Sequence, residues 1–336
     1  MLSKAGAPLP ALAELFAGLE RSTGLLLAVS GGPDSTALLV LADRWRKDSG
    51  VAVSVATVDH GLRPASRQEA EAVGAVCAAR GLPHAILPWT DEKPATGVPA
   101  AARAARYRLL GAQARKIGAD MIVTAHHADD QAETVLMRLL RGSGPAGLAG
   151  MARRAPAFWP DGEGLFLARP LLDCAKSDLI GFCRAEGLTY VEDPTNVDEA
   201  YRRPQIRRLA ERLAREGFGR AELTRLAARA ARAEQALAPA IETMLAALPA
   251  RREAAVFETP AEAILALHDE AIVRLLSREI ARIGGAAARL EQVEKIASGL
   301  RQKSRFSATL GGVAIRLDAK RLILQPQKPR KRRAES

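Results

Sequence analysis

The stretch LLLAVSGGPDSTALLVLADRW, Leu25 to Trp45, joins an apolar, strand-like run to a helical pattern through the turn Ser30–Ser35. No lysine follows the two glycines, so the turn is not the mononucleotide loop that ends in Gly-Lys-Ser/Thr. It also lacks the third glycine of the dinucleotide-binding fingerprint. Glycines nevertheless let a ligand approach the backbone closely, and the free N–H groups at the start of the following helix favour an anion. The turn therefore predicts a phosphate-binding loop.

The carboxylate of Asp34 is unexpected beside phosphates, because it would repel them. We interpret it as a partner for Mg²⁺ that is bound to the phosphates. The ordinary alternative is a strand-to-helix turn in which Pro33 begins the helix and Asp34 or Ser35 caps it. Such a turn does not need all six residues, which favours the phosphate interpretation. The predicted loop consists of Ser30, Gly31, Gly32, Pro33, Asp34 and Ser35.

Around this loop, strand-like and helical patterns alternate along the first half of the chain. The strand-like apolar runs are 25–29, 51–58, 85–89 and 121–124, with a further one at 165–168. The helical patterns between them are 35–46, 65–80 and 100–117. This alternation is typical of a parallel sheet covered by helices, so the sequence predicts an α/β fold.

The composition narrows the class of protein. The chain has 336 residues, enough for two domains, and its net charge of +11 indicates a polyanionic partner, either nucleic acid or a membrane surface. No apolar run reaches the ~20 residues that span a bilayer. Cys77, Cys174 and Cys183 form no Cys-x-x-Cys pair and no even disulfide set, which favours a reducing cytoplasm.

Beyond Asp193-Pro194 the pattern becomes helical and basic, with ten arginines and three glutamates between residues 202 and 232. A short strand pair is expected at 313–317 and 321–324. The sequence predicts an α/β domain over 1–214, a mainly helical, basic domain with this strand pair over 215–327, and a basic tail over 328–336.

Four further segments carry polar residues where an open parallel sheet is expected to place its ligands, just past the carboxyl ends of its strands. They are VDHGLR at 58–63, ARYRLL at 105–110, TAHHADDQAET at 124–134 and LLRGSGPAGLAGM at 139–151. In their order and spacing, SGGPDS, DHGLR, HHADDQAET and RGSGPAGLAGM resemble the tRNA(Ile)-lysidine synthetase family of the N-type ATP pyrophosphatase group. The resemblance covers about residues 24–210, and several motifs agree rather than one.

The resemblance implies a fold and a reaction. It implies a parallel-sheet PP-loop ATP pyrophosphatase domain, and cleavage of ATP to AMP and pyrophosphate. It further implies that free L-lysine is joined, through an adenylated cytidine, to C2 of the wobble cytidine of a tRNA(Ile) with a CAU anticodon. ATP and Mg²⁺, the tRNA, L-lysine and a cytoplasmic location follow as expectations, and a homodimer stays open.

On this resemblance, loop Ser30–Ser35 holds the pyrophosphate, and Arg106 stabilises the α-phosphate or the adenylated base. The residues alone would equally make Arg106 a solvated helix arginine. Asp130 and Glu133 are three apart on a helix, so their carboxylates share a face. They suit a lysine ammonium or a base that removes its proton, although carboxylates are also common where a helix begins.

Other polar residues of these motifs leave alternatives open. Asp59, at an expected strand end, meets a ribose, fixes His60 or caps the next turn. His126 and His127 lie beside two aspartates, but no further histidine is near, so polar packing beside the nucleotide is favoured over a transition-metal site.

The arginine-rich segment after the first domain is expected to meet tRNA phosphates. Ile206, Leu209 and Leu213 fall on one helical face, and several arginines fall opposite. The predicted contacts are Arg203, Arg207, Arg208, Arg212 and Arg215, with a solvated face as the ordinary alternative. Pro204 stands where the family generally has asparagine, which separates this turn from the family pattern.

Two competing functions remain. A tRNA thiolase with the same ATP loop is disfavoured, because its relatives typically use cysteine motifs that this chain lacks. A non-catalytic RNA-binding protein with a vestigial nucleotide loop is disfavoured by the intact Asp34, Ser35, Asp130 and Glu133.

Overall fold

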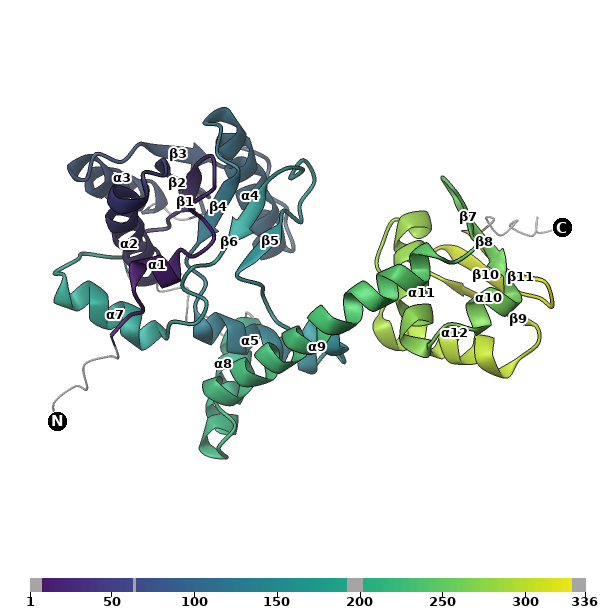
Figure 1. The fold of residues 1–336 in the computed structure, drawn as a ribbon. Helices are drawn as coiled ribbons and strands as arrows, with labels where there is room; N and C mark the ends of the chain where they lie inside the picture. Colours follow the sequence, from purple (N-terminus) through teal and green to yellow (C-terminus); the bar gives the residue numbers. More distant parts are fainter. Residues whose placement is uncertain (1–7, 63–64, 192–201, 328–336) are drawn as a thin grey trace. The chain divides into compact units, whose positions relative to one another are not determined.

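The computed structural model describes residues 8–62, 65–191 and 202–327, and for 202–204 only the backbone. The chain forms two compact units (Figure 1). The first contains the described residues up to Met137 together with 150–225. The second contains 138–149 together with the residues from Leu226 onward.

The first unit is built on a six-stranded sheet in the order β3-β2-β1-β4-β6-β5. Its strands are β1 (Leu25–Ala28), β2 (Val53–Asp59), β3 (His84–Pro88), β4 (Met121–Thr124), β5 (Arg154–Pro156) and β6 (Phe166–Ala168). All neighbours pair in parallel except β5, which is antiparallel to β6 at the edge. The predicted α/β fold with five parallel strands is confirmed.

The helices predicted at 35–46, 65–80 and 100–117 are confirmed among the helices that accompany the sheet. The accompanying helices are α1 (Leu12–Leu15), α2 (Pro33–Ser49), α3 (Ser66–Ala79), α4 (Val98–Lys116), α5 (Ala128–Leu139), α7 (Lys176–Ala185) and α8 (Arg202–Arg215). Helix α2 ends at Gly50, whose φ of 72° is the left-handed conformation that closes many helices.

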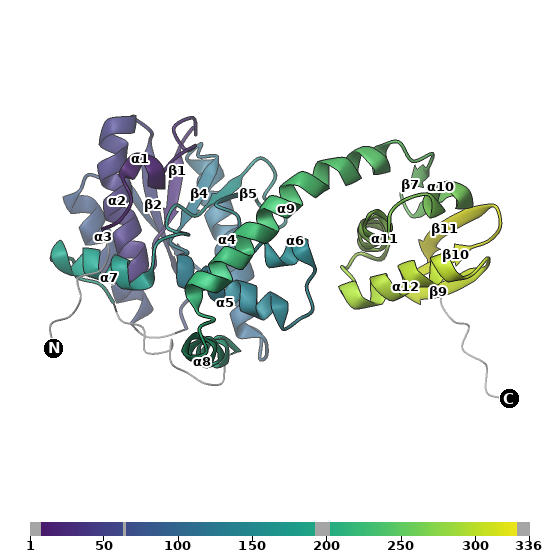
Figure 2. The same ribbon diagram turned by 60° about the horizontal axis from the view of Figure 1, so that its bottom comes forward.

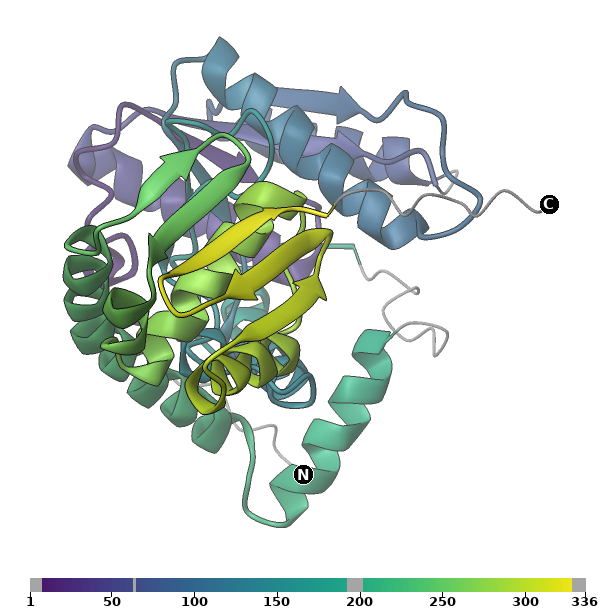
Figure 3. The ribbon, with the colours of Figure 1, turned by 90° about the vertical axis from the view of Figure 1, so that its right-hand side faces the viewer.

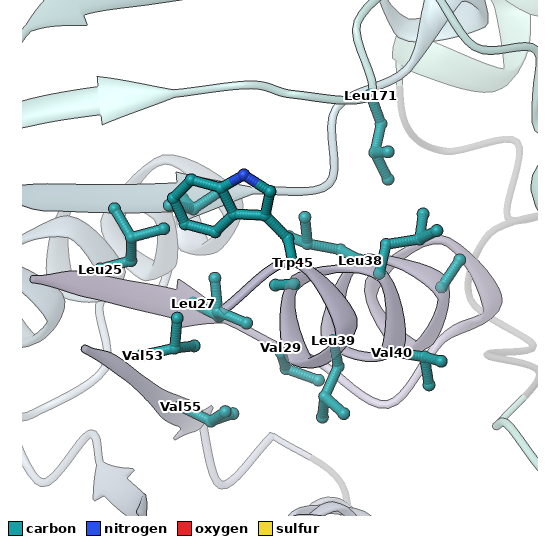
Figure 4. Packing of buried hydrophobic residues seen from close by; sticks show 14 of the residues in the cluster. Leu25, Leu27, Val29, Leu38, Leu39, Val40, Trp45, Val53, Val55 and Leu171 are labelled. Carbon is teal, nitrogen blue, oxygen red and sulfur yellow. The ribbon is translucent and has the colours of Figure 1, made fainter. Parts of the chain in front are cut away.

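The two faces of the sheet bury alternate residues of the same strand, as the two-residue period of a strand requires. Leu25 and Leu27 of β1 pack in one cluster with α2, including Trp45, as Figure 4 shows. Leu26 packs on the opposite face in a second cluster with Leu110 of α4. Burial on both faces explains why β1 reads as a continuous apolar run.

The strand order reverses beside β1. The chain runs outward from β1 through β2 to β3. It then returns, so that β4 lies on the other side of β1 from β2 (Figure 2). The segments that follow β1 and β4 therefore diverge at neighbouring strand ends. In open α/β sheets such a reversal is where ligands bind, outside the carboxyl ends of the strands.

The second unit has a five-stranded antiparallel sheet in the order β7-β8-β11-β10-β9. In Figure 3 its strands, coloured green to yellow, lie toward the viewer. The strands are β7 (Arg251–Glu253), β8 (Val256–Pro260), β9 (Phe306–Leu310), β10 (Val313–Leu317) and β11 (Arg321–Pro326). The predicted strand pair is β10 and β11, and three further strands extend it. This unit also contains the helices α10 (Ala261–Leu265), α11 (Asp269–Gly284) and α12 (Leu290–Gln302). The helix α9 (Arg220–Ala246) belongs to it from residue 226 onward.

Two details of the second unit differ from the simplest sequence pattern. Residues 261–283, whose sequence predicts one continuous helical segment, form two helices, because His268 has an extended conformation (ψ 154°) between α10 and α11. Segment 138–149, with the short helix α6 (Pro145–Leu148), belongs here although it interrupts the first unit in sequence. Gly144 of this segment lies against Leu290 of α12.

Candidate active site

The loop after β1 is held in shape by its own serines. Gly31 has a φ of 87°, a conformation that favours glycine, and Pro33 begins α2. The Ser35 hydroxyl donates to the Gly32 carbonyl (3.0 Å) and accepts from the Ser30 N–H (3.2 Å). These bonds fix the loop with Asp34 in the first turn of α2.

One oxygen of Asp34 is left without a partner. Oδ1 is buried and accepts no hydrogen bond from the described residues, while Oδ2 lies 3.6 Å from Nε2 of His127. A buried carboxylate oxygen without a donor is costly unless something else compensates its charge. Its chemistry fits a hard cation such as Mg²⁺, which prefers oxygen ligands.

His127 stands between three carboxylates, and its side chain is 5% exposed. Nε2 lies 3.3 Å from Oδ2 of Asp130 and 3.6 Å from Oδ2 of Asp34, and Nδ1 lies 3.6 Å from Oδ2 of Asp129. Burial lowers the pKa of His127, but the three carboxylates outweigh it and raise the pKa to about 9. At neutral pH the imidazole is therefore charged and offsets part of the negative charge around it.

The two aspartates that begin α5 have different partners. Oδ2 of Asp130 accepts from the backbone N–H of His127 (3.1 Å), which is a helix-start contact. Asp129 accepts from the N–H of Lys176 (2.9 Å) and from Arg220 (3.2 Å). Although burial opposes it, the imidazole of His127 and the hydrogen bond donated by the Lys176 N–H hold the pKa of Asp129 far below its ordinary value. Asp129 therefore ties α5 to the starts of α7 and α9.

Glu133, one helical turn beyond Asp130, forms an ion pair with Arg207 of α8. The Arg207 Nε donates to Oε1 at 2.6 Å, and the side chains are 36% and 9% exposed for Arg207 and Glu133. Oε2 of Glu133 is buried and accepts no hydrogen bond from the described residues. Burial lowers the pKa of Arg207, but Glu133, Asp130 and Asp34 together raise it. The guanidinium thus lies within the influence of three predicted site carboxylates.

A second group lies at the end of the neighbouring strand β2. Asp59 accepts from the Gly61 N–H (2.9 Å) and the Ser66 hydroxyl (2.6 Å), which is the turn-capping arrangement among its three interpretations. The hydrogen bond from Ser66 is the main cause that lowers the pKa of Asp59. Burial and the nearby Arg106 both lower the pKa of His60, which places Arg106 of α4 at this strand end.

Sequence reasoning missed one structural clamp on α5. Gln131 is buried, donates to the Met151 carbonyl (2.9 Å) and accepts from the Met151 N–H (2.8 Å). Gly150 has a φ of 71°, and a Cβ there would lie 2.7 Å from the Gln131 amide oxygen. Gly150, the last glycine of RGSGPAGLAGM, was the available sequence signal for this contact, because a glycine permits such a close approach.

The arginines of α8 are divided between its two faces. Ile206 is buried, and Leu209 and Leu213 are half-buried, whereas Arg208, Arg212 and Arg215 are exposed. The predicted amphipathic pattern is confirmed, and Arg207 lies on the side of the site. The side chain of Arg203 falls outside the described residues.

Neither a membrane-spanning helix nor a preformed metal centre is present among the described residues. No helix in these ranges combines the length and the apolar character of a membrane span. No group of three or more His, Cys, Asp or Glu among the same residues is arranged to hold a metal ion by itself.

The chain is similar to known proteins over nearly its whole length. A family model described as a PP-loop domain matches residues 10–213. The tRNA(Ile)-lysidine synthase of Rhodopseudomonas palustris is 46% identical over 335 residues, which cover 95% of each chain. That of Methylobacterium nodulans is 46% identical over 318 residues, covering 92% of this chain and 91% of the relative.

Among solved structures, the U34-tRNA thiolase NcsA from Methanococcus maripaludis has a TM-score of 0.54 with 16% sequence identity. The match covers 65% of this chain and 77% of that chain. At this identity the likeness concerns the fold alone.

Proposed function

Because the chain belongs to the tRNA(Ile)-lysidine synthase family of PP-loop proteins, we propose that the site between β1 and β4 serves both halves of its reaction. The protein is an ATP-dependent ligase, and its reaction is lysidine formation. The first half would adenylate the wobble cytidine of a CAU-anticodon tRNA(Ile), and the second would join L-lysine to C2.

One observation carries this proposal. The residues predicted for ATP and those predicted for lysine come from motifs about a hundred positions apart, yet a single imidazole links them. Nε2 of His127 lies within 3.6 Å of both Asp34 and Asp130. A shared site is what a two-step reaction needs, since the activated cytidine must meet the amine where it was formed.

For the ATP half, the geometry supports the loop Ser30–Ser35 as the pyrophosphate site and Asp34 as a ligand of Mg²⁺. When bound, Mg²⁺ would neutralise charge that develops on the phosphates. The N–H groups at the start of α2 add donors to the same place. Arg106 would act on the α-phosphate or the adenylated base, from the end of β2.

For the lysine half, Asp130 and Glu133 support a cation site. Both are on one face of α5, and Oε2 of Glu133 is buried with no donor among the described residues. A lysine ammonium would satisfy that oxygen, and either carboxylate could then take a proton from the attacking amine.

For the tRNA, the exposed arginines of α8 support phosphate contacts, as do Arg203 and the basic residues 215–327 and 328–336. Phosphate contacts position an RNA without reading its sequence. A tRNA substrate and three buried, free cysteines support a cytoplasmic location. Sedimentation velocity tests the homodimer that the sequence leaves open.

The direct test incubates the protein with ATP, Mg²⁺, unmodified tRNA(Ile) with a CAU anticodon and radiolabelled L-lysine. We expect one lysine incorporated per tRNA, with AMP and pyrophosphate released. A tRNA with a methionine identity and the same anticodon is the control. ATP cleavage without lysine incorporation, or transfer of sulfur to the tRNA, would contradict the proposal.

A further inference from the structure

The ion pair between Glu133 and Arg207 joins a carboxylate proposed to bind L-lysine to a cation of the protein itself. We propose that Arg207 occupies the site of the substrate ammonium, so that L-lysine binds well only after tRNA has drawn Arg207 away from Glu133. The inference rests on the proposed lysine-binding role of Glu133. It adds a residue that sets the order in which the substrates bind.

The first step of the argument is the position of the guanidinium. Its Nε lies 2.6 Å from Oε1 of Glu133, and Asp130 and Asp34 also stabilise its charge. These carboxylates are the ones proposed for ATP and lysine. Arg207 is therefore a cation already seated among the groups that a cationic substrate would use.

The second step is that the site does not suit two cations at once. The Glu133 side chain is 9% exposed, so water screens little of the repulsion between a guanidinium and an ammonium on the same carboxylate. The buried Oε2 of Glu133 accepts no hydrogen bond from the described residues, so it would be available to the substrate ammonium once Arg207 has left.

The third step is what could remove Arg207. It is on α8, where Arg208 and Arg212 are exposed. An arginine binds phosphate as readily as carboxylate, through parallel N–H donors. A tRNA backbone along α8 would give Arg207 an alternative anion and free Glu133. Lysine would then enter only when the cytidine it must modify is present.

The test measures binding of radiolabelled L-lysine to the full chain by equilibrium dialysis, without ATP so that no turnover occurs. Without tRNA, we expect Arg207→Gln to bind lysine at least tenfold more tightly than the wild type. Added tRNA should tighten lysine binding to the wild type and have little effect on Arg207→Gln. Arg44→Gln is the matched control, because Arg44 pairs with Glu186 in the same unit and outside the site.

Two outcomes separate this inference from the lysine site itself. If Arg207→Gln binds lysine no better than the wild type, while Glu133→Gln weakens binding, the lysine site stands and the occupancy by Arg207 is wrong. If Glu133→Gln changes lysine affinity neither alone nor with Arg207→Gln, the proposed lysine site is wrong, and this inference falls with it.

Folding is controlled separately, because Arg207→Gln leaves the buried Glu133 carboxylate without its guanidinium. Added lysine should raise the melting temperature of Arg207→Gln more than that of the wild type. Arg207→Lys keeps a cation on a different stem and should bind lysine with an affinity between the two. An Arg207→Lys protein that binds lysine more weakly than the wild type would overturn the inference.

Discussion

Nε2 of His127 lies 3.6 Å from Oδ2 of Asp34, although His127 follows β4 and Asp34 lies in the first turn of α2. The contact joins the loop Ser30–Ser35, proposed to hold phosphate, to the helix that carries Asp130 and Glu133. His127 also neighbours Asp129 and Asp130. A change of charge at one of these carboxylates therefore alters the electrostatic environment of the others through the shared imidazole.

The first prediction concerns Asp34. We expect Asp34→Ala to lower tRNA-dependent pyrophosphate release by at least about 100-fold, because charge on the phosphates loses its compensating metal ligand. Binding of tRNA, measured by filter retention, should stay near that of the wild type. Normal turnover in Mg²⁺ would show that the loop has been assigned wrongly.

The second prediction concerns Asp130, and its substitution can separate charge from helix capping. Asn keeps a side-chain oxygen that accepts from the His127 N–H, so α5 should still begin normally. The lost charge should weaken lysine binding by about 2–5 kcal/mol, read as a higher lysine KM.

Asp129→Asn is the control for Asp130→Asn, because Asp129 is engaged by Lys176 and Arg220. It should change the lysine KM far less than Asp130→Asn does. The melting temperatures of the two variants are compared to measure the effect of each substitution on folding. Equal effects of the two substitutions would return Asp130 to a purely structural role at the start of α5.

The third prediction concerns the exposed arginines of α8. If they contact phosphates, tRNA affinity falls with salt, and Arg212→Gln or Arg215→Gln should each flatten the log–log slope by about 0.7–0.9. Arg44→Gln should leave the slope unchanged. A steep slope that neither α8 substitution alters would place the phosphate contacts elsewhere.

The basic tail over 328–336, which is outside the described residues, allows a related measurement. Its deletion should weaken cognate and non-cognate tRNA alike, because phosphate contacts carry no sequence information. Selective loss of the cognate tRNA would mean that the tail reads identity.

The fourth prediction concerns the thiols. Burial raises the pKa of Cys77, Cys174 and Cys183 to about 11. At pH 8, on the order of one thiol in a thousand is then ionised, and the thiolate is the reactive form. Iodoacetamide should label almost none in the native protein and all three in guanidinium chloride. Rapid native labelling would reopen the thiolase alternative.

Local patterns were sufficient to predict most of the first unit. The run 121–124 is β4 to the residue, because four apolar or β-branched residues lie between polar turns and are buried on both faces. The loop Ser30–Ser35 could be found because its glycines and hydroxyls are adjacent in sequence. Five-residue β9 was missed even though its exposure alternates, since short amphipathic strands resemble loops.

The contacts that join distant segments could not be predicted. Arg207 and Glu133 are 74 positions apart, and no local pattern says which of several α8 arginines turns inward. The same holds for strand β7, whose three residues are charged and exposed and which exists only because β8 pairs with it. Such elements depend on tertiary pairing rather than on propensity.

The segment 138–149 has a consequence for how the protein is made. It is synthesised before residues 150–225, yet it belongs to the unit that starts again at Leu226. At ordinary translation speeds the ribosome adds the intervening residues in roughly 4–15 seconds, during which this segment waits without its partners. A nascent chain released before residue 226 would therefore carry segment 138–149 inside its nucleotide-binding unit without the residues that the segment packs against. Cellular quality control would then treat the two units as one product, because part of the second unit lies within the sequence of the first.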